Sequence, residues 1–251
     1  MTLSDSKLTA VLLPGFGCDI DSMLELDHAL NESQYIDRTQ CEVFTSEATL
    51  DEMASKVVRQ YSDSELLLVG FSMGGWIAQE VASRLRSQVK GLVLISSWTE
   101  APSHYLEIIH NLNRELKSGK TLDSMRSIVA EGFTNTVTRD AMASRWVSMA
   151  NRIGPEIFIR QTKAILEDPC VNQCVPEIQC PSLAIAGVAD MLLSPAEQFK
   201  WFVDQKIFQT ITLDSCGHNL IWEQPQTVSK TIGQWLNAKF NSDDEYQHPY
   251  S

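Results

Sequence analysis

The chain has 251 residues, which is enough for one domain with a sizeable core or for a core with an inserted subdomain. Hydrophobic residues make up 43% and charged residues 21%, as is typical of a soluble globular protein, and the formal net charge is −12. Such an acidic chain argues against nucleic-acid and anionic membrane partners, because both require a basic face.

The start of the chain and the cysteines predict a cytoplasmic protein. Residues 1–15 lack a basic stretch followed by a long apolar run, so we expect no signal peptide. The sequence also has no run of 18 apolar residues, so we expect no membrane span. Three of six cysteines cluster in "PCVNQCVPEIQCP", without the fourth ligand and paired spacing of a zinc site. We expect reduced thiols and no metal or organic cofactor; one disulfide among Cys170, Cys174 and Cys180 is left open.

The first hundred residues alternate between expected strands and helices. The expected strands are apolar runs that end in turn residues, and the helices between them show apolar residues on one face. Buried strands that alternate with helices predict a parallel sheet covered on both faces. The expected strands of this part are 8–15, 41–44, 66–71 and 91–96.

The pattern changes near residue 100. Residues 100–174 contain no clear strand and are expected to form several short helices. Strands are again expected at 181–187 and 207–214, with helices starting at Ser194 and within 225–236. The sequence therefore predicts an α/β core from 1–99 and 175–240, a helical insertion at 100–174, and a disordered tail at 241–251.

Ser72 lies between glycines in "LLLVGFSMGGW", directly after an expected buried strand and before an expected helix. A serine on such a sharp turn exposes its Oγ above the end of the sheet, and only small residues fit at Gly70 and Gly74. The N–H groups that begin the helix can stabilise a negative oxygen at the same place. This stretch predicts a nucleophilic serine, although a glycine-rich turn alone can also be a simple bend.

A serine needs a base, and histidine is the usual one. Of the five histidines, only His218 directly follows the last expected strand of the core. Asp190 follows the preceding strand and is the candidate carboxylate that orients the imidazole. The order Ser72, Asp190, His218 is that of an α/β-hydrolase. Asp214 and Glu100 are the rival carboxylates.

An oxyanion hole requires backbone donors from two different segments. The Met73 N–H follows the candidate nucleophile, and the Phe16 N–H lies in "LLPGFG", where the chain turns after the first strand. The alternative reading of Pro14-Gly15 is a simple turn.

Together, "LLPGFGCDIDSM", "LLLVGFSMGGWIA", "IQCPSLAIAGVADMLLSP" and "LDSCGHNLIWEQPQTV" resemble the α/β-hydrolase superfamily over residues 8–240. The resemblance is to a bacterial branch with carboxylesterases, enol-lactonases and pimeloyl carrier-protein methyl ester esterases. It implies an α/β-hydrolase fold with a doubly wound, mostly parallel sheet and a helical cap. It also implies a catalytic triad of Ser72, Asp190 and His218, with Phe16 and Met73 at the oxyanion hole. The chain departs from the family by Pro14-Gly15 instead of His-Gly, and by lacking an Asp-x-x-Gly-x-Gly loop near residues 41–52.

The expected activity is that of a serine carboxylesterase that forms an acyl-enzyme with a small or medium ester carrying an apolar acyl group. Lactone, thioester and C–C hydrolysis remain alternatives, and a non-catalytic ligand receptor is a hypothesis of a different class. A carrier-linked ester is neither favoured nor excluded, since residues 100–174 have no net charge. The oligomeric state is left open. The candidates for the substrate pocket are aromatic and methionine side chains: Trp98, Phe133, Met142, Trp146, Met149 and Phe158.

Overall fold

The computed structural model describes residues 7–130 and 132–241. A six-stranded sheet with the order β2-β1-β3-β4-β5-β6 forms its centre, and every pair of neighbouring strands is parallel. This confirms the predicted fold class. The strands are β1 (Leu8–Leu13), β2 (Ile36–Cys41), β3 (Leu66–Phe71), β4 (Val89–Ile95), β5 (Ser182–Gly187) and β6 (Phe208–Leu213).

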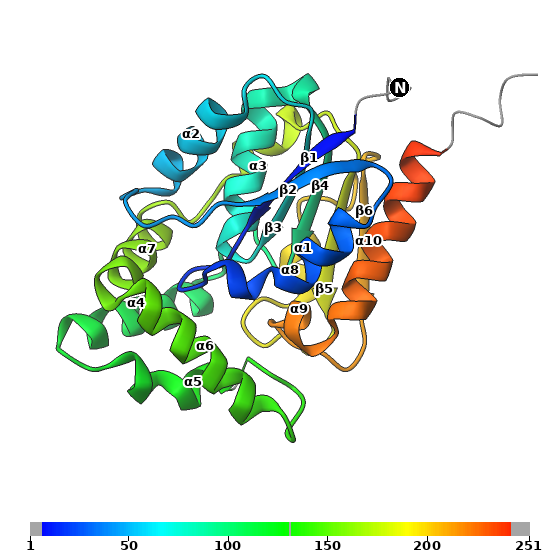
Figure 1. Ribbon diagram of the computed structural model, residues 1–251. Coiled ribbons are helices and arrows are strands. Elements are labelled where there is room, and N and C mark those ends of the chain that lie inside the picture. The colour runs from blue at the N-terminus through cyan, green and yellow to red at the C-terminus, as the bar shows by residue number, and fades with distance from the viewer. Residues whose placement is uncertain (1–6, 131, 242–251) are drawn as a thin grey trace, which may run out of the picture.

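Helices cover both faces of the sheet (Figure 1). On one face α2 packs against α3, and on the other α1 packs against α10. The helices of the core are α1 (Leu24–Asn31), α2 (Leu50–Tyr61), α3 (Met73–Leu85), α8 (Pro195–Phe199), α9 (Leu220–Glu223) and α10 (Pro225–Phe240). Short 3-10 turns are formed by η1 (Ile20–Ser22), η2 (Arg86–Gln88), η3 (Leu122–Met125) and η4 (Asn172–Glu177).

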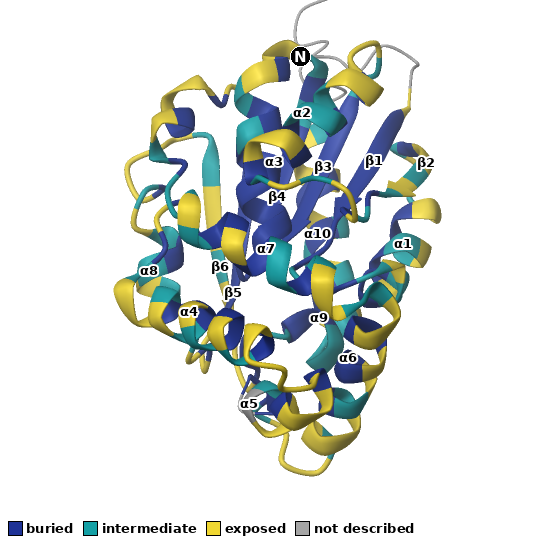
Figure 2. Cartoon of the chain, turned by 90° about the vertical axis from the view of Figure 1, so that its left-hand side faces the viewer, coloured by how far each residue is buried: buried dark blue, intermediate teal, exposed yellow. Residues whose placement is uncertain are grey.

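Burial follows the apolar pattern of the strands. Every residue of β1, β3 and β5 is buried, because these strands have neighbours on both edges and helices on both faces. Figure 2 shows the inner strands in dark blue, whereas the outward faces of the helices are yellow. The edge strands β2 and β6 are partly exposed.

One predicted strand was placed wrongly. The expected strand at 41–44 is β2 at Ile36–Cys41, and Phe44 is instead a buried residue of the loop that follows. The sequence of β2 is polar, "IDRTQC", because an edge strand has only one neighbour and most of its side chains face water. Its hydrophobic signal was therefore weaker than that of the loop beside it.

Between β4 and β5 lie four helices, here called the inserted helices: α4 (Ser103–Lys117), α5 (Arg126–Ala130), α6 (Arg139–Ile153) and α7 (Pro155–Glu167). They lie beyond the carboxyl ends of the strands, at the lower end of Figures 1 and 2. Within the group, α4 packs against α7 and α5 against α6, and α7 also touches α2 of the core. Parallel α/β sheets carry their sites at the carboxyl ends of the strands, so these helices lie over the region where a site is expected.

Nearly all of the predicted disordered tail, residues 241–251, lies outside the described residues. Within the described ranges, no helix is long and apolar enough to cross a membrane.

Candidate active site

Ser72 forms the turn between β3 and α3. Its backbone has φ +51° and ψ −118°, a strained combination for a residue with a side chain, and the residue is 2% exposed. Two hydrogen bonds hold the turn: the Ser72 N–H donates to Ile95 O at 2.9 Å, and Ser97 Oγ–H donates to Ser72 O at 2.9 Å. The turn is therefore anchored to β4 and to the loop after it.

The glycines around Ser72 are required by close backbone approach. A Cβ on Gly74 would lie 1.9 Å from Leu13 O, and one on Gly70 would lie 2.4 Å from Gly74 O. Both distances are far below van der Waals contact, so any larger residue would push α3 away from β1 and β3. The sequence-based explanation of these two glycines agrees with this geometry.

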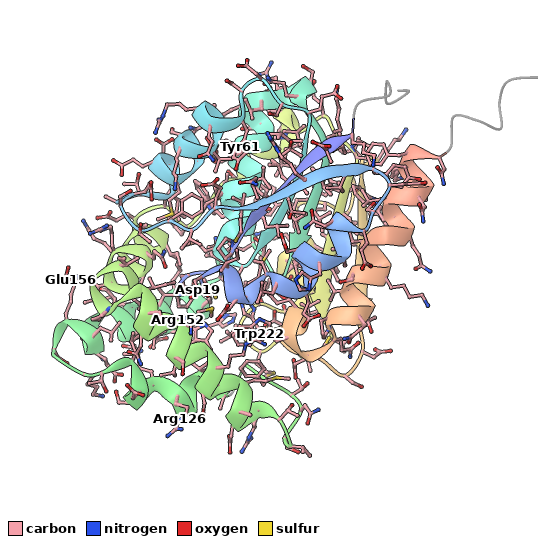
Figure 3. The ribbon with its side chains drawn as sticks, in the orientation of Figure 1. Asp19, Tyr61, Arg126, Arg152, Glu156 and Trp222 are labelled. Atoms are coloured by element: carbon pink, nitrogen blue, oxygen red, sulfur yellow. The ribbon has the colours of Figure 1, made fainter. Side chains whose placement is uncertain are left out.

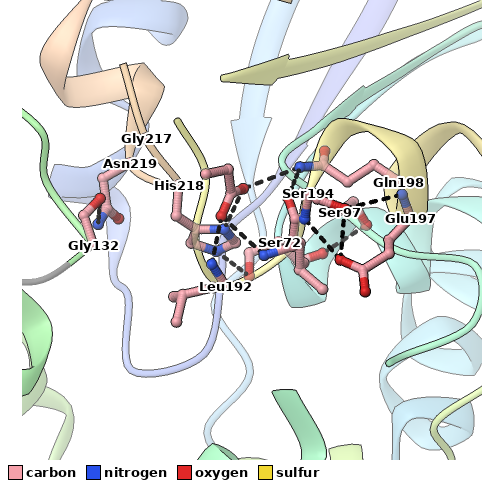
Figure 4. Close-up of polar contacts among 12 residues, drawn as sticks. Ser72, Ser97, Gly132, Leu192, Ser194, Glu197, Gln198, Gly217, His218 and Asn219 are labelled. Carbon is pink, nitrogen blue, oxygen red and sulfur yellow. Dashed lines mark hydrogen bonds and ion pairs between the residues drawn. The ribbon is translucent and has the colours of Figure 1, made fainter. Parts of the chain in front are cut away.

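His218 contacts both other candidate residues (Figure 4). Its Nε2 lies 3.1 Å from Ser72 Oγ, and its Nδ1 lies 2.9 Å from Asp190 Oδ2. His218 and Asp190 are 6% and 4% exposed, so the hydrogen bonds lie in a largely water-excluded place. A chain of hydroxyl, imidazole and carboxylate in this order can move a proton from the serine to the histidine.

The Asp190 carboxylate is held by further donors. Oδ1 accepts hydrogen bonds from the N–H groups of Leu192 and Leu193, both at 2.9 Å, and Oδ2 accepts one from Gln198 Nε2 at 3.0 Å. A buried carboxylate needs such partners, because an unpaired one would be expensive to desolvate. These donors also fix the direction in which the carboxylate faces His218.

Glu223, in α9, holds the loop that carries His218. Its Oε2 accepts from the Gly217 N–H at 2.7 Å, and its Oε1 accepts from the Thr134 N–H at 2.6 Å. One carboxylate thus joins the His218 loop to the segment between α5 and α6. Glu223 was not among the predicted site residues, because its position five residues after the candidate histidine was the single feature of the sequence that pointed to it.

The turn after β1 lies beside Ser72. A Cβ on Gly15 would be 3.3 Å from Ser72 Cβ, and Phe16 and Ser72 line the same cavity. Met73 is buried as the first residue of α3, where helical N–H groups have no partner within the helix. The Gly17 N–H donates to Gln161 Oε1 of α7 at 2.8 Å, which ties this turn to the inserted helices.

A cavity of about 80 Å³ opens onto Ser72 and His218. Its walls are mostly apolar, and α4 supplies a stripe of residues at positions i, i+3, i+4 and i+7. These residues lie within the helical insertion predicted at 100–174, but they were not among the predicted pocket residues. The residues from the inserted helices and from η3 are Tyr105, Ile108, Ile109, Leu112, Met125, Val129 and Trp146.

The six expected pocket residues separate into three groups. Trp146 lines the cavity, and Phe158 packs edge-on against Phe16 and Trp146 just behind it. Trp98 packs against Tyr105, behind a lining residue. Of the six, Trp146 alone is a lining residue; of the last three, Met149 is buried in the main core, while Phe133 and Met142 belong to a small separate cluster.

The rival carboxylates lie elsewhere. Glu100 forms an exposed ion pair with Lys200 at 2.7 Å, and Asp214 is an exposed residue after β6. In contrast, Asp190 is the carboxylate that lies within hydrogen-bonding distance of His218 Nδ1. All six cysteines are free, and the described residues contain no group of three or more His, Cys, Asp or Glu arranged to hold a metal ion.

Salt bridges connect the inserted helices to the core near the site. Arg152 of α6 lies beside Asp19 (Figure 3). Arg152 Nη2 is 2.8 Å from Asp19 Oδ2, and Arg152 also forms an ion pair with Asp21. Asp19 caps η1, directly after the turn that carries Phe16. The position of α6 is thus linked to the same turn that α7 contacts through Gln161.

Comparisons with known proteins agree with this fold. The chain is 23% identical over 249 residues to a pimeloyl-[acyl-carrier protein] methyl ester esterase of Shewanella woodyi, a match that covers 94% of this chain and 86% of the relative. Among solved structures, the enol-lactonase from Burkholderia xenovorans superposes with a TM-score of 0.78 at 16% identity, over 92% of both chains. A thermophilic esterase from Thermogutta terrifontis gives a TM-score of 0.76 at 21% identity, over 94% of this chain and 92% of that one.

The family model for the alpha/beta hydrolase fold matches residues 13–225, which include β3, the Ser72 turn and the loops of Asp190 and His218. This match spans most of the sheet and all of the inserted helices. The chain therefore belongs to the alpha/beta hydrolase family.

Proposed function

We propose that the protein is a serine hydrolase that cleaves carboxylic esters through an acyl-enzyme. The observation that carries this proposal is the position of His218, whose two ring nitrogens lie within hydrogen-bonding distance of Ser72 Oγ and Asp190 Oδ2. The proposal is further supported by relatives that bear the names methyl ester esterase and esterase.

Acylation begins when Ser72 Oγ attacks the ester carbonyl and His218 Nε2 takes the hydroxyl proton. Asp190 keeps the other ring proton on Nδ1 and stabilises the imidazolium that forms. In this proposal the N–H groups of Phe16 and Met73 donate hydrogen bonds to the negative carbonyl oxygen. Phe16 lines the same cavity as Ser72, and Met73 is the first residue of α3. Collapse of the tetrahedral intermediate releases the alcohol, which takes the proton from His218.

Deacylation repeats these steps with water. His218 removes a proton from the water, the resulting hydroxide attacks the acyl carbon, and Ser72 leaves with the returned proton. The buried position of His218 and Asp190 keeps the charges in a place of low dielectric constant, where their interaction is strong.

We propose that residues 100–174 act as a cap that selects the substrate, on a core of residues 1–99 and 175–240. The cavity is small and its walls are mostly apolar, and residues of α4 and Trp146 of α6 line it together with Ser72. These features favour a short apolar acyl group. Lactones, thioesters and C–C substrates fit the same triad chemistry and are distinguished from esters by direct assay.

A carrier-linked ester is the second candidate, because a relative is named for such a substrate. Some of the arginines of the inserted helices are already paired within the chain, as Arg152 is with Asp19 and Asp21. The small cavity favours a free ester, and assays with matched free and carrier-linked esters decide between the two.

The test is hydrolysis of p-nitrophenyl esters from acetate to decanoate by the wild type and by Ser72→Ala. We expect activity to peak at short chains and to fall to background in Ser72→Ala. The matched control is Ser83→Ala, on the far part of α3, where the hydroxyl donates to Glu80 O and lies away from the cavity. This variant should keep full activity.

Two outcomes would refute the proposal. Equal activity in the wild type and Ser72→Ala would mean that another residue is the nucleophile. Absence of ester hydrolysis together with failure of an alkyl fluorophosphonate to label Ser72 would favour a ligand receptor, because only an activated serine reacts with this reagent.

A further inference from the structure

Tyr105 carries a buried hydroxyl without a regular hydrogen-bond partner among the described residues. The residue lies in the first turn of α4 and is 1% exposed. Among the described residues its Oη has no hydrogen bond of regular geometry, and the Ser72 hydroxyl is the side chain close enough to act on it as a hydrogen-bonding group. Buried polar groups are nearly always paired, because an unpaired one loses its hydration without compensation. An exception in a cavity indicates a group that a ligand completes.

The Tyr105 hydroxyl belongs to the cavity of the catalytic serine. Tyr105, Ser72 and His218 line the same cavity, whose other walls are mainly aliphatic and aromatic. Burial raises the pKa of the Tyr105 hydroxyl and the charge of Asp190 raises it further, while the nearby Ser72 hydroxyl acts in the opposite direction. The hydroxyl is consequently a neutral donor at physiological pH.

Tyr105 is held firmly in this place. Its ring packs against Trp98 with 5.2 Å between the ring centroids. The preceding residue, His104, has its Nε2 3.0 Å from Leu192 O, in the loop whose N–H groups bind Asp190. The first turn of α4 and the Asp190 loop are thereby joined, so the hydroxyl needs no rearrangement to meet a bound substrate.

The segments that surround Ser72 leave the sheet on both sides of β3. Phe16 follows β1, on one side of β3, whereas Tyr105, Asp190 and His218 follow β4, β5 and β6 on the other side. In the proposed reaction the carbonyl oxygen turns toward Phe16 and Met73. The alkoxy oxygen must lie near His218 Nε2 to receive its proton, and the segment that carries Tyr105 leaves the sheet on the same side of β3 as the segment that carries His218.

We propose that Tyr105 Oη–H donates a hydrogen bond to the alkoxy oxygen of the ester while that oxygen leaves the acyl carbon; this inference rests on the proposed ester hydrolase function. The C–O bond breaks, its electron pair stays on the alkoxy oxygen, and His218 Nε2 supplies the proton that completes the alcohol. Tyr105 keeps its own proton throughout. Its hydrogen bond strengthens as negative charge grows on the oxygen, so it lowers the barrier rather than only improving binding.

The test varies the leaving group with the acyl group held constant. Wild type and Tyr105→Phe are compared by kcat/KM on methyl butyrate and p-nitrophenyl butyrate. The phenyl ring preserves the packing against Trp98. We expect a loss of about tenfold or more on the methyl ester but less than about threefold on the p-nitrophenyl ester, because p-nitrophenolate disperses its charge and needs little help to leave.

The control is Tyr61→Phe, which also removes a hydroxyl from a buried tyrosine. Tyr61 Oη donates to Glu42 Oε1 at 2.6 Å, away from the cavity. This variant should be less stable, yet its ratio of kcat/KM for the two esters should equal that of the wild type.

Equal losses on both esters in Tyr105→Phe, or no loss on either, would overturn the role of Tyr105. If Ser72→Ala is inactive in the same assays, the ester hydrolase proposal survives that result. If Ser72→Ala retains activity, or if the wild type hydrolyses neither butyrate nor any other ester of the series, both proposals fall together.

Discussion

The loops at the carboxyl ends of the strands and the inserted helices build the two halves of the candidate site by different means. In the loops, backbone atoms approach so closely that single glycines are required: a Cβ on Gly187 would lie 2.4 Å from Gly217 O, where the Asp190 and His218 loops meet. The inserted helices instead face the site with packed side chains, such as Trp146 and Phe158, which pack edge-on against each other and against Phe16 of the turn after β1.

In the proposed function, this difference separates the groups that carry out the reaction from the side chains that select the substrate. The backbone contacts of the loops allow almost no substitution, so the reacting groups keep fixed distances from one another. Side-chain packing in the helices tolerates volume-conserving changes, so the cavity can be reshaped without moving Ser72 or His218. Several polar contacts join the two halves, among them Gln161 to Gly17, Arg152 to Asp19 and His104 to Leu192.

The largest expected effect comes from changing the carboxylate in the loops. Asp190→Asn should lower kcat by about 10⁴-fold, because the amide no longer holds the imidazole in the tautomer that accepts the serine proton. Folding should persist, since the side chain has nearly the same shape. Steady-state kinetics on the best p-nitrophenyl ester and thermal unfolding measure the two effects separately.

Asp214→Asn is the matched control for this substitution. Asp214 is the acidic residue closest in sequence to His218, but it is exposed and its backbone oxygen accepts from Gln224 Nε2. We expect no change in kcat. A large loss in this variant, with little loss in Asp190→Asn, would show that the carboxylate was assigned wrongly.

The next effect concerns stability. Gly74→Ala places a Cβ 1.9 Å from Leu13 O and should destabilise the fold by about 4 kcal/mol or more, because β1 and α3 cannot both keep their positions. Urea unfolding measures this loss.

Gly233→Ala is its control, at a half-buried position of α10 where the new Cβ would meet nothing within 4 Å beyond the backbone of its own helix. It should raise stability by about 0.5–1 kcal/mol through helix propensity. Near-wild-type stability in Gly74→Ala would contradict the requirement for glycine at the turn.

The same contrast explains what the sequence could predict. Inner strands such as β3 are unbroken apolar runs, so their positions were predicted almost to the residue, and the Gly-Ser-Gly spacing marked the turn. The edge strand β2 was misplaced because its exposed residues carry no such signal. A short sequence pattern can reveal only constraints that act within a short segment, and the loops of the candidate site have such constraints.

No sequence pattern indicated the residues that connect the inserted helices with the loops at the carboxyl ends of the strands. Gln161 and Tyr105 lie in helices whose polar residues mostly face water, and only the packing of α7 and α4 over the sheet brings them to the site. Pocket residues were chosen by side-chain type, which finds Trp146 but cannot separate lining residues from those that pack behind them, such as Met149. The interhelical packing that decides this depends on contacts between segments far apart in the chain.

The smallest of the expected effects lies at the junction of the two halves. Gln161, 1% exposed, accepts from the Gly17 N–H at 2.8 Å and donates to Phe44 O at 2.7 Å. Gln161→Met keeps the volume but leaves both backbone groups unpaired, so we expect a loss of about 2 kcal/mol in stability. Because Gly17 follows the proposed oxyanion donor at Phe16, kcat should also fall by about tenfold, with KM less affected.

Gln60→Met separates these two consequences. Gln60 also donates side-chain hydrogen bonds, to Glu42 Oε1 at 2.6 Å and Tyr61 Oη at 3.1 Å, but it lies away from the cavity. It should lose stability while keeping kcat. If Gln161→Met behaves in the same way, the turn after β1 holds its catalytic shape through the core alone, and the inserted helices select substrate without supporting the chemistry. A fall in kcat confined to Gln161→Met would instead show that α7 helps to keep the proposed oxyanion donor in position.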